Sequence, residues 1–446
     1  MKRPKLLALG AASALLLAAC SPGSDNDDKN GGGDNTGSNG ESSVVTFRLW
    51  DETAVPAYEE SFAKFTEQNP DIKVEIELVD WGQYWERLPR DISTGDMADI
   101  FWVNSNSFGL YADNGDLLSI TDELGDDHDE WEESIVNLYT REDHLWGVPQ
   151  IWDSVALFYN KEMVEEAGID PSDLTWAPDA GEGDTLLAAA QALTTDADGN
   201  TADSADFNPN NIKTFGFNAM ADLQAIYVDF LAQAGAEFQD ENDMFAFDSA
   251  EGVDAFQYLV DMIHEHHVAP PASETNLNGD YARELFVRGE LGLFQSGPYS
   301  LTHIAEGAEF DWGIAPIVGG PEGKISVVHG VVAVGNADTE NKEATVEVLR
   351  WLGSAEGQEP LATHGIAFPG AVDAQAAYVD YWAKEGVDVS VFIDSAQEPT
   401  APAPIGPNSA AGLGAIDPII KDIFLGATPV DDGLAQAQEE GNAAME

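Results

Sequence analysis

Strand-like and helix-like segments alternate between residues 44 and 103. The segments 44–50, 72–79 and 98–103 are rich in apolar and β-branched residues, and the second of them alternates with a period of two. The segments 56–69 and 81–94 between them carry aromatic and apolar residues at helical spacing. Strands that alternate with helices favour an α/β fold, in which a mainly parallel sheet is flanked by helices.

Ligands of such sheets bind beyond the carboxyl ends of the strands, which here places the loops 51–55, 80–82 and 104–108 at a binding edge. Farther along we expect a strand at 155–161, a mostly helical stretch to about residue 300, a strand at 325–334, and helices at 342–352 and, last, 412–424. The roughly 400 residues after the N-terminal region exceed one ordinary core, so two domains are expected.

The first residues, MKRPKLLALGAASALLLAAC, have the pattern of an export signal, with a basic start and a short apolar run that ends at Cys20, the only cysteine of the chain. LAAC resembles a bacterial lipobox, so 1–19 are predicted to be a signal peptide and Cys20 to be lipidated. The alternative is an ordinary cleaved signal with an incidental cysteine. Residues 21–43 are rich in Gly, Ser, Asn and Asp and are predicted to be a flexible linker, with folding from about residue 44. The protein is thus expected at the outer face of the cytoplasmic membrane, on the extracellular or periplasmic side, held by lipid.

The net charge of the chain limits the classes of partner that it can bind. It has 81 Asp and Glu against 19 Lys and Arg, a formal net charge of −62. Nucleic-acid binding needs a basic surface and is excluded, and anionic ligands are disfavoured. Two interpretations of the acidity stay open: an acidic exported protein that remains soluble, or adaptation to high salt, which screens self-repulsion.

The sequence carries no complete catalytic, nucleotide or metal motif. HEHH at 264–267 lacks the histidine at 268 that a zinc helix needs, and an Asp-Gly turn explains 196–200 better than a calcium loop, although calcium near Asp196 stays an alternative. There is no P-loop and no G-x-S-x-G, and the many acids prevent the choice of a glycosidase pair. We therefore expect no enzyme activity, no metal and no cofactor.

Aromatic residues next to polar ones recur at the expected strand ends. The clusters are at 50–52, 81–85, 102–106, 152–154 and 296–299. A flat ring can pack against the C–H face of a sugar, and a neighbouring carboxylate or amide can bond its hydroxyls. A single tryptophan of this kind more often belongs to the core, but five clusters at expected strand ends together predict a sugar site.

Several motifs occur in an order typical of one family. WDETAVPAYEESFAKFTEQNPDIKV, YWERL with GDMADIFW, GVPQIWDSVALFYNK and GELGLFQSGPYS resemble the extracellular solute-binding proteins of family 1, the maltodextrin-binding-protein-like sugar-binding lipoproteins of ABC importers. Tyr299 departs from the family's usual Trp, and Ala98 from its usual Pro. The resemblance extends from residue 44 almost to the C-terminus.

The resemblance implies two α/β lobes, each a mainly parallel sheet flanked by helices, that clamp a ligand between them. The chain would cross the hinge three times, near 152–156, 327–333 and 379. Lobe 1 would be 44–153 plus 333–378, and lobe 2 would be 156–327 plus 379–446. It also implies a monomer that delivers its ligand to the membrane subunits of an ABC permease. Hinge closure would follow ligand binding, because the ligand binds better when both lobes contact it.

Ligand contact is carried over from the family's motifs to five residues and inferred for the others from loop position. The motif-derived residues are Glu52, Trp102, Ser105, Asp153 and Tyr299. Loop position adds Trp81, Asn104, Asn106 and Trp152, together with His329 at a hinge crossing and Asn408 in a Pro-rich loop. Asp153 is expected to accept hydrogen bonds from ligand hydroxyls while ionised.

The expected ligand is a neutral mono- or oligosaccharide. Two alternatives are a surface-anchored carbohydrate-active enzyme, which would turn its sugar over, and a binding protein for a cationic ligand such as a polyamine, which the many acids would favour.

Overall fold

The predicted alternation of strands and helices is confirmed in the computed structural model, which describes residues 42–178, 183–397 and 399–446. The predicted signal peptide, Cys20 and nearly all of the linker lie outside these residues. The alternating elements are β1 (Ser43–Leu49), α1 (Val55–Gln68), β2 (Ile72–Leu78), α2 (Trp81–Thr94) and β3 (Ile100–Asn104).

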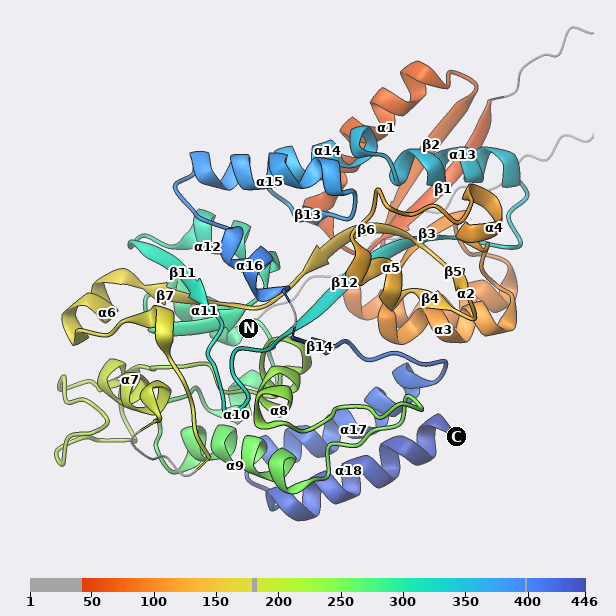
Figure 1. The fold of residues 1–446 in the computed structure, drawn as a ribbon. Helices are drawn as coiled ribbons and strands as arrows, with labels where there is room; N and C mark the ends of the chain where they lie inside the picture. Colours follow the sequence, from red (N-terminus) through yellow and green to blue (C-terminus); the bar gives the residue numbers. More distant parts are fainter. Residues whose placement is uncertain (1–41, 179–182, 398) are drawn as a thin grey trace, which may run out of the picture. The chain divides into compact units, whose positions relative to one another are not determined.

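A mixed sheet forms the larger of the two main sheets (Figure 1). Within the described residues it has seven strands, in the order β13-β6-β12-β3-β1-β2, with β14 paired to β12. The strands not yet given are β6 (Val148–Asp153), β12 (Ser326–Gly335), β13 (Phe368–Pro369) and β14 (Thr400–Pro402). β1 pairs in parallel with β2 and β3, whereas β12 is antiparallel to both β3 and β6.

Helix spacing explains how α1 covers this sheet. Tyr58, Phe62 and Phe65 are buried at intervals of four and three residues, and the ring of Phe47 on β1 lies 4.8 Å from that of Tyr58. At the other side of β1, the buried Arg48 donates to Glu77 on β2 and to Asp91 on α2, each at 2.9 Å. A buried cation is tolerated only when it is paired in this way.

The smaller sheet corrects one expectation. It consists of β10 (Leu293–Ser296), β7 (Ala156–Asn160) and β11 (Trp312–Pro316), and both neighbours of β7 run antiparallel to it. The mainly parallel sheet expected for the second lobe is therefore wrong in its strand directions, because an alternating strand–helix pattern does not determine the direction of every strand. The two-lobed α/β fold itself is confirmed by structures compared below.

Helices cover both sheets, and two short two-stranded sheets occur in the connecting segments. The remaining helices are α3 (Ser105–Asn114), α4 (Ile120–Leu124), α5 (Glu133–Leu138), α6 (Lys161–Ala167), α7 (Thr185–Leu193), α8 (Val228–Ala234), α9 (Ala250–His264), α10 (Ala272–Thr275), α11 (Tyr281–Val287), α12 (Leu301–Gly307), α13 (Lys342–Leu352), α14 (Ala355–Thr363), α15 (Val372–Lys384), α16 (Ser390–Ser395), α17 (Ser409–Phe424) and α18 (Val430–Met445). The short strands are β4 (Thr140–Arg141), β5 (His144–Leu145), β8 (Thr195–Asp196) and β9 (Ile212–Thr214). The last helix is thus α18, and not the expected helix at 412–424, which is α17.

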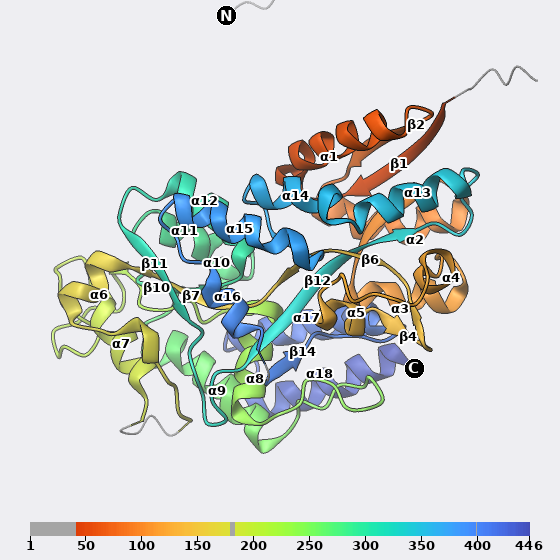
Figure 2. The ribbon, with the colours of Figure 1, turned by 45° about the horizontal axis from the view of Figure 1, so that its top comes forward.

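The chain passes between the sheets along β6–β7 and β12, as Figure 2 shows from a second side. Residue 379, where a third crossing is expected, lies inside α15, which packs on α14 and β13 of the larger sheet. The next helix, α16, contacts β7 and β11 of the smaller sheet. Among the described residues, no helix is long and apolar enough to span a membrane.

Candidate functional site

The carboxyl ends of several strands meet at one edge of the larger sheet. β1, β2 and β3 are parallel, so Trp50, Trp81 and Asn104 follow at the same edge. β12 runs the other way and brings its first half to this edge, where His329 pairs with Asp153 at the end of β6. The structure therefore brings together residues from four separate parts of the sequence, as the strand-end argument predicts.

A cavity of about 80 Å³ lies at this edge. Its walls come from the loop after β1, the end of β6, the segment after β10 and the segment before β13. The lining residues are Asp51, Thr53, Ile151, Trp152, Asp153, Pro298, Tyr299, Thr302, His303, Ile366 and Ala367. Elements attached to both main sheets thus contribute to one cavity.

Asp153 is half-buried in this cavity, and its surroundings set its protonation. Loss of solvent raises the pKa of its carboxyl to about 7, against the opposing effect of a hydrogen bond from the Gln224 amide. Across the strand pair, burial lowers the pKa of His329 to about 4, so its imidazole is neutral at pH 7. The expectation that Asp153 is ionised consequently holds fully only above neutral pH.

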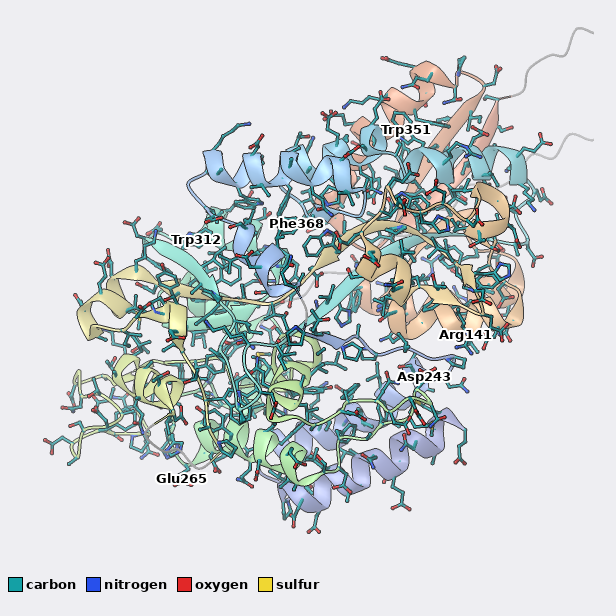
Figure 3. All side chains as sticks on the ribbon, in the orientation of Figure 1. Arg141, Asp243, Glu265, Trp312, Trp351 and Phe368 are labelled. Carbon is teal, nitrogen blue, oxygen red and sulfur yellow. The ribbon has the colours of Figure 1, made fainter. Side chains whose placement is uncertain are left out.

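The aromatic residues nominated from the sequence divide into two groups. Trp81 and Tyr299 are 53 % and 43 % exposed, so each offers part of a ring face to a ligand. Trp102 is 1 % exposed and packs at 5.0 Å against Trp50, and Trp152 stacks on Phe368, which is labelled in Figure 3. The indole of Trp152 still lines the cavity along its edge, whereas Trp102 lies in the aromatic core.

Eight of the eleven nominated residues lie outside the cavity wall, which contains only Trp152, Asp153 and Tyr299 of the set. Besides Trp81, Trp102, Asn104 and His329, they are the following four. Ser105 is buried and donates to the carbonyl of Pro404 at 2.8 Å, and Asn408 donates to the carbonyl of Met445 at 2.9 Å, so both hold loops to the body. The side chain of Asn106 accepts from Ser107, and Glu52 is exposed at the start of a short 3-10 helix, Glu52–Ala54. Its neighbour Asp51 lines the cavity instead and caps that helix through Thr53.

Several buried polar atoms near the edge have no hydrogen-bond partner within the described residues. They are Oδ1 of Asn104, Nε1 of Trp152 and Nε2 of His329. Buried polar groups are normally bonded, so these atoms mark places where a ligand hydroxyl or a water fits.

Sequence reasoning missed part of the wall. Thr302 and His303 lie on the helix that follows Tyr299, next to the recognised motif, but no sequence pattern marks Ile366 or Ala367. No pattern marks Gln224 either, which is not part of the wall but donates to Asp153. Gln224 lies on a π-helix, Leu223–Tyr227, and such turns are frequent at functional sites. Only the fold brings it to Asp153.

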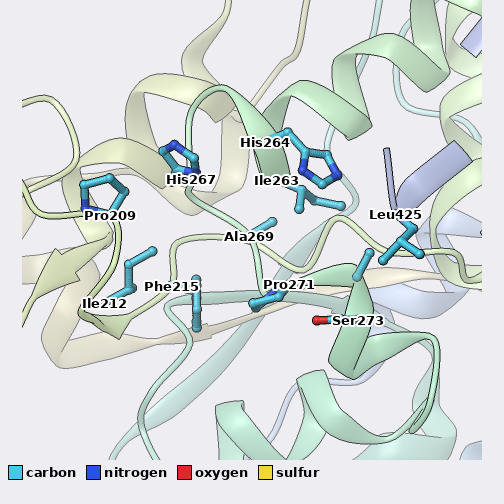
Figure 4. A pocket seen from close by; sticks show the side chains of 11 residues that line it. Pro209, Ile212, Phe215, Ile263, His264, His267, Ala269, Pro271, Ser273 and Leu425 are labelled. Carbon is cyan, nitrogen blue, oxygen red and sulfur yellow. The ribbon is translucent and has the colours of Figure 1, made fainter. Parts of the chain in front are cut away.

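The two segments that were considered as metal sites make hydrogen bonds within the protein. The HEHH segment borders an apolar cavity of about 220 Å³ away from the strand ends (Figure 4), where His264 bonds the carbonyl of Phe424 at 2.8 Å. The carboxylate of Asp196 accepts from the backbone of Asp198, Asn200 and Asn208, which closes the predicted turn. Among the described residues, no group of three or more potential ligands could hold a metal ion.

Known proteins are similar to this chain in sequence and in fold. An arabinooligosaccharide-binding protein of Halalkalibacterium halodurans is 25 % identical over 220 residues, 48 % of this chain and 44 % of the relative. The crystal structure of M. tuberculosis UspC is 43 % identical, covers 90 % of this chain and 100 % of its own, and has a TM-score of 0.76. Lmo0181 of Listeria monocytogenes, an ABC substrate-binding protein solved with cycloalternan, is 20 % identical over 91 % of this chain and 99 % of its own, with a TM-score of 0.77.

The family model described as bacterial extracellular solute-binding protein matches residues 50–359, well over half of the chain. The relatives and structural neighbours include sugar-binding proteins of ABC importers with the two-lobed fold. The chain therefore belongs to the bacterial extracellular solute-binding proteins.

Proposed function

We propose that this protein is the membrane-anchored substrate-binding component of an ABC importer and that it captures a neutral sugar or oligosaccharide. The observation that carries the proposal is the cavity whose walls come from both main sheets, with Tyr299 on one side and Asp51 and Asp153 on the other. A ring face combined with carboxylate acceptors suits a polyol, which offers both C–H faces and hydroxyl donors.

Capture requires the cleft to open. The cavity of about 80 Å³ is smaller than the roughly 300 Å³ at which small-molecule sites begin. A ligand therefore enters an open form and then stabilises the closed one, because only the closed form contacts it from both sides. In our proposal the hinge consists of 153–156, the first half of β12, and 385–389, which links α15 to α16; this last segment replaces the crossing expected at 379.

The charge of the site favours a neutral ligand over an anion. Asp51 and Asp153 line the cavity, and no Lys or Arg does so within the described residues. The same two carboxylates support the second candidate, a cationic ligand such as a polyamine. Neutral sugars are favoured by Tyr299 and Trp81 and by the ligands of relatives and structural neighbours, which include arabino-oligosaccharides, cycloalternan and maltose.

Anchoring and delivery complete the proposal. Cys20 at the end of the LAAC motif would carry the lipid, and the closed body would dock on the membrane subunits of a permease. The proposal contains no catalytic step, in agreement with a family of binding proteins.

Isothermal titration calorimetry against neutral sugars, a uronate, a sugar phosphate and a polyamine tests the ligand class, and chromatography of the recovered ligand tests turnover. We expect stoichiometric binding of a neutral sugar, recovered unchanged. Binding of only the anions or only the polyamine would refute the neutral-sugar assignment, and a hydrolysed product would identify an enzyme. Mass spectrometry of the membrane-extracted chain, with Cys20→Ala as the control, tests the lipid.

A further inference from the structure

The strand β2 lies at one edge of the larger sheet and has no neighbour on its outer side within the described residues (Figure 1). The backbone carbonyl of Asp71, just before β2, accepts from β1, and the N–H of Val79, just after it, donates to β1. Successive residues of a strand point their backbone groups to opposite sides. The N–H and C=O groups of the even-numbered residues of β2 therefore point outward, and these residues include Val74, Ile76 and Leu78.

This edge lacks the features that usually prevent pairing with another chain. Soluble proteins protect edge strands with bulges, prolines, covering segments or charges. β2 pairs with β1 over its whole length without a bulge, contains no proline and carries a single lysine, Lys73. Leu78 is 43 % exposed, and Val74 and Ile76 are half-buried. The edge thus offers backbone hydrogen-bonding groups and apolar side chains to a further strand.

Helix α1 leaves this edge open. The helix packs on α14 as well as on β2, and a groove of about 680 Å³ remains between the helix and the edge strand. Phe62, Ala63 and Thr66 of α1 form one wall of this groove, and Val74 and Ile76 of β2 form the other. The groove therefore has room for the side chains of a strand that pairs with β2.

The charges of β2 are complementary to those of a second copy of the same strand. Lys73 and Glu75 are more than half exposed, and Lys73 bonds Glu75 of its own chain at 2.6 Å. If two copies of β2 pair antiparallel through their outward groups, the registers of greatest overlap are centred on Val74, Glu75 and Ile76. The register centred on Val74 sets Lys73 of each copy opposite Glu75 of the other. The other registers set Glu75 opposite Glu75 or Glu77, and like charges that face each other directly are destabilising.

We propose that two copies of this protein associate through the free edges of β2, antiparallel and centred on Val74, so that their larger sheets form one continuous sheet. A two-fold axis makes the interface identical in both copies, and the Lys73–Glu75 pair forms twice. The dimer differs from the monomer that the family resemblance implies. Residues 72–76 line no part of the cavity at the strand ends, so the dimer leaves the proposed ligand site free.

The dimer is weak and depends on salt. The strand segment 72–76 and the groove contain fewer residues than the roughly 20–30 a side of a stable interface. At low salt the net charge of −62 on each copy opposes association, and Glu59 and Glu67 at the groove add to this repulsion. About 1–2 M NaCl shortens the Debye length to about 3 Å or less and removes the long-range repulsion, whereas backbone hydrogen bonds and apolar contacts remain.

Sedimentation equilibrium of the full chain with Cys20→Ala, which cannot be lipidated, tests association. We expect a monomer at about 0.1 M NaCl, and at about 0.5 M and above a dimer that grows with protein concentration up to about 200 µM. Hydrogen–deuterium exchange locates the interface, because the outward N–H groups of Val74 and Ile76 become bonded only in the dimer. Their exchange should slow as the protein concentration rises at about 0.5 M NaCl.

Charge variants test the register at the same salt concentration. Lys73→Glu and Glu75→Lys each set like charges opposite each other in a dimer of identical chains, so each should weaken the dimer at least about threefold. An equimolar mixture of the two variants restores opposite charges at both positions and should dimerise like the wild type. Glu75→Lys also separates register from net charge, because it makes the chain less negative and general repulsion alone would strengthen its dimer.

Arg288→Glu is the matched control. Arg288 bonds Glu290, two positions later, at 2.8 Å, as Lys73 bonds Glu75, but it follows α11 and lies outside the groove. The substitution changes the net charge as Lys73→Glu does and should leave the dissociation constant of the dimer almost unchanged.

Three outcomes would overturn the inference. A chain that stays monomeric at about 2 M NaCl and about 200 µM does not form the dimer. A dimer in which the amides of Val74 and Ile76 exchange as fast as in the monomer uses another surface. Stronger self-association of Glu75→Lys, or a mixture of the two charge variants that stays monomeric, would refute the register centred on Val74.

Discussion

Replacement of Asp153 by Asn should weaken sugar binding and at the same time stabilise the free protein. In the folded protein, loss of solvent raises the pKa of Asp153 from 3.8 to about 7. Above pH 7 the carboxylate is ionised in both states, and folding therefore transfers a charge from water to a site that favours the neutral form. One pKa unit corresponds to about 1.4 kcal/mol, so a shift of about three units lowers the free energy of unfolding by up to roughly 4 kcal/mol at pH 8.

The sign of this effect sets its pH window. A raised carboxyl pKa means that the folded state binds more protons than the unfolded state between about pH 4 and 7, so stability falls as the pH rises through that window. The asparagine of the variant stays neutral at every pH, and its amide can donate to the oxygen of a rotated Gln224. The gain in melting temperature of Asp153→Asn should therefore be largest near pH 8 and vanish near pH 4.

Calorimetric melting of the wild type and of Asp153→Asn from pH 4 to pH 8 measures the difference in melting temperature. Titration with the sugar at pH 8 measures the loss of affinity, which should be at least about tenfold because one charged hydrogen bond is lost. A pH-independent change in stability would refute the assigned ionisation. A lower melting temperature of the variant at pH 8 would show that the carboxylate is a net stabilising group. An unchanged dissociation constant would remove Asp153 from the site.

The other predictions concern the exposed rings, one buried turn and the net charge. Trp81→Ala and Tyr299→Ala should each weaken sugar binding by about 1–3 kcal/mol in calorimetric titration, with little change in melting temperature, since both rings are half-exposed. A variant that unfolds while its remaining folded fraction binds the sugar normally would assign that ring to the core. Asp196→Asn should destabilise the protein at pH 7, because the Asn200 amide and three backbone N–H groups hold the pKa of the Asp196 carboxyl at about 2. The loss of stability should disappear as the pH falls towards that value. Chemical denaturation at several pH values measures the difference in stability, and an equal difference at every pH would contradict the prediction. Raising NaCl from about 0.05 M to about 1–2 M should raise the melting temperature, because it shortens the Debye length and screens the net charge of −62. The affinity for a neutral sugar should change much less, since the ligand carries no charge. A melting temperature that does not change with NaCl concentration would argue against salt adaptation.

The sequence predicted which loops meet at the strand-end edge of the larger sheet better than it predicted the contacts of the residues there. Hydrophobic periodicity was sufficient to find β1, β2 and β3, and parallel pairing then placed their loops at one edge. Whether Trp81 or Trp102 faces solvent depends on how α1 and α2 pack, and no local pattern encodes that. Gln224 reaches Asp153 across 71 positions of the chain, a distance over which spacing carries no information.

The antiparallel direction of the smaller sheet has the same explanation. β7 was found from its apolar run, but its neighbours β10 and β11 come from segments more than 130 residues later in the chain. Strand direction follows from where the chain returns after its helices, which is a property of the whole fold. The buried position of Ser105 and the half-buried position of Asn408 are likewise set by contacts with Pro404 and Met445, far from each in sequence.

The single strand β12 makes the two lobes cooperative in unfolding. One half of β12 pairs with β3 and β6, and the other half pairs with β14, while Val327 donates its backbone N–H to the buried Asp229 of α8. Unfolding of either lobe would break part of the pairing of β12. The backbone N–H and C=O groups released in this way would have no partners in the lobe that remains folded, which would destabilise that lobe. The protein should therefore absorb heat in one transition on melting, even though our proposal has its two lobes move relative to each other when a ligand binds.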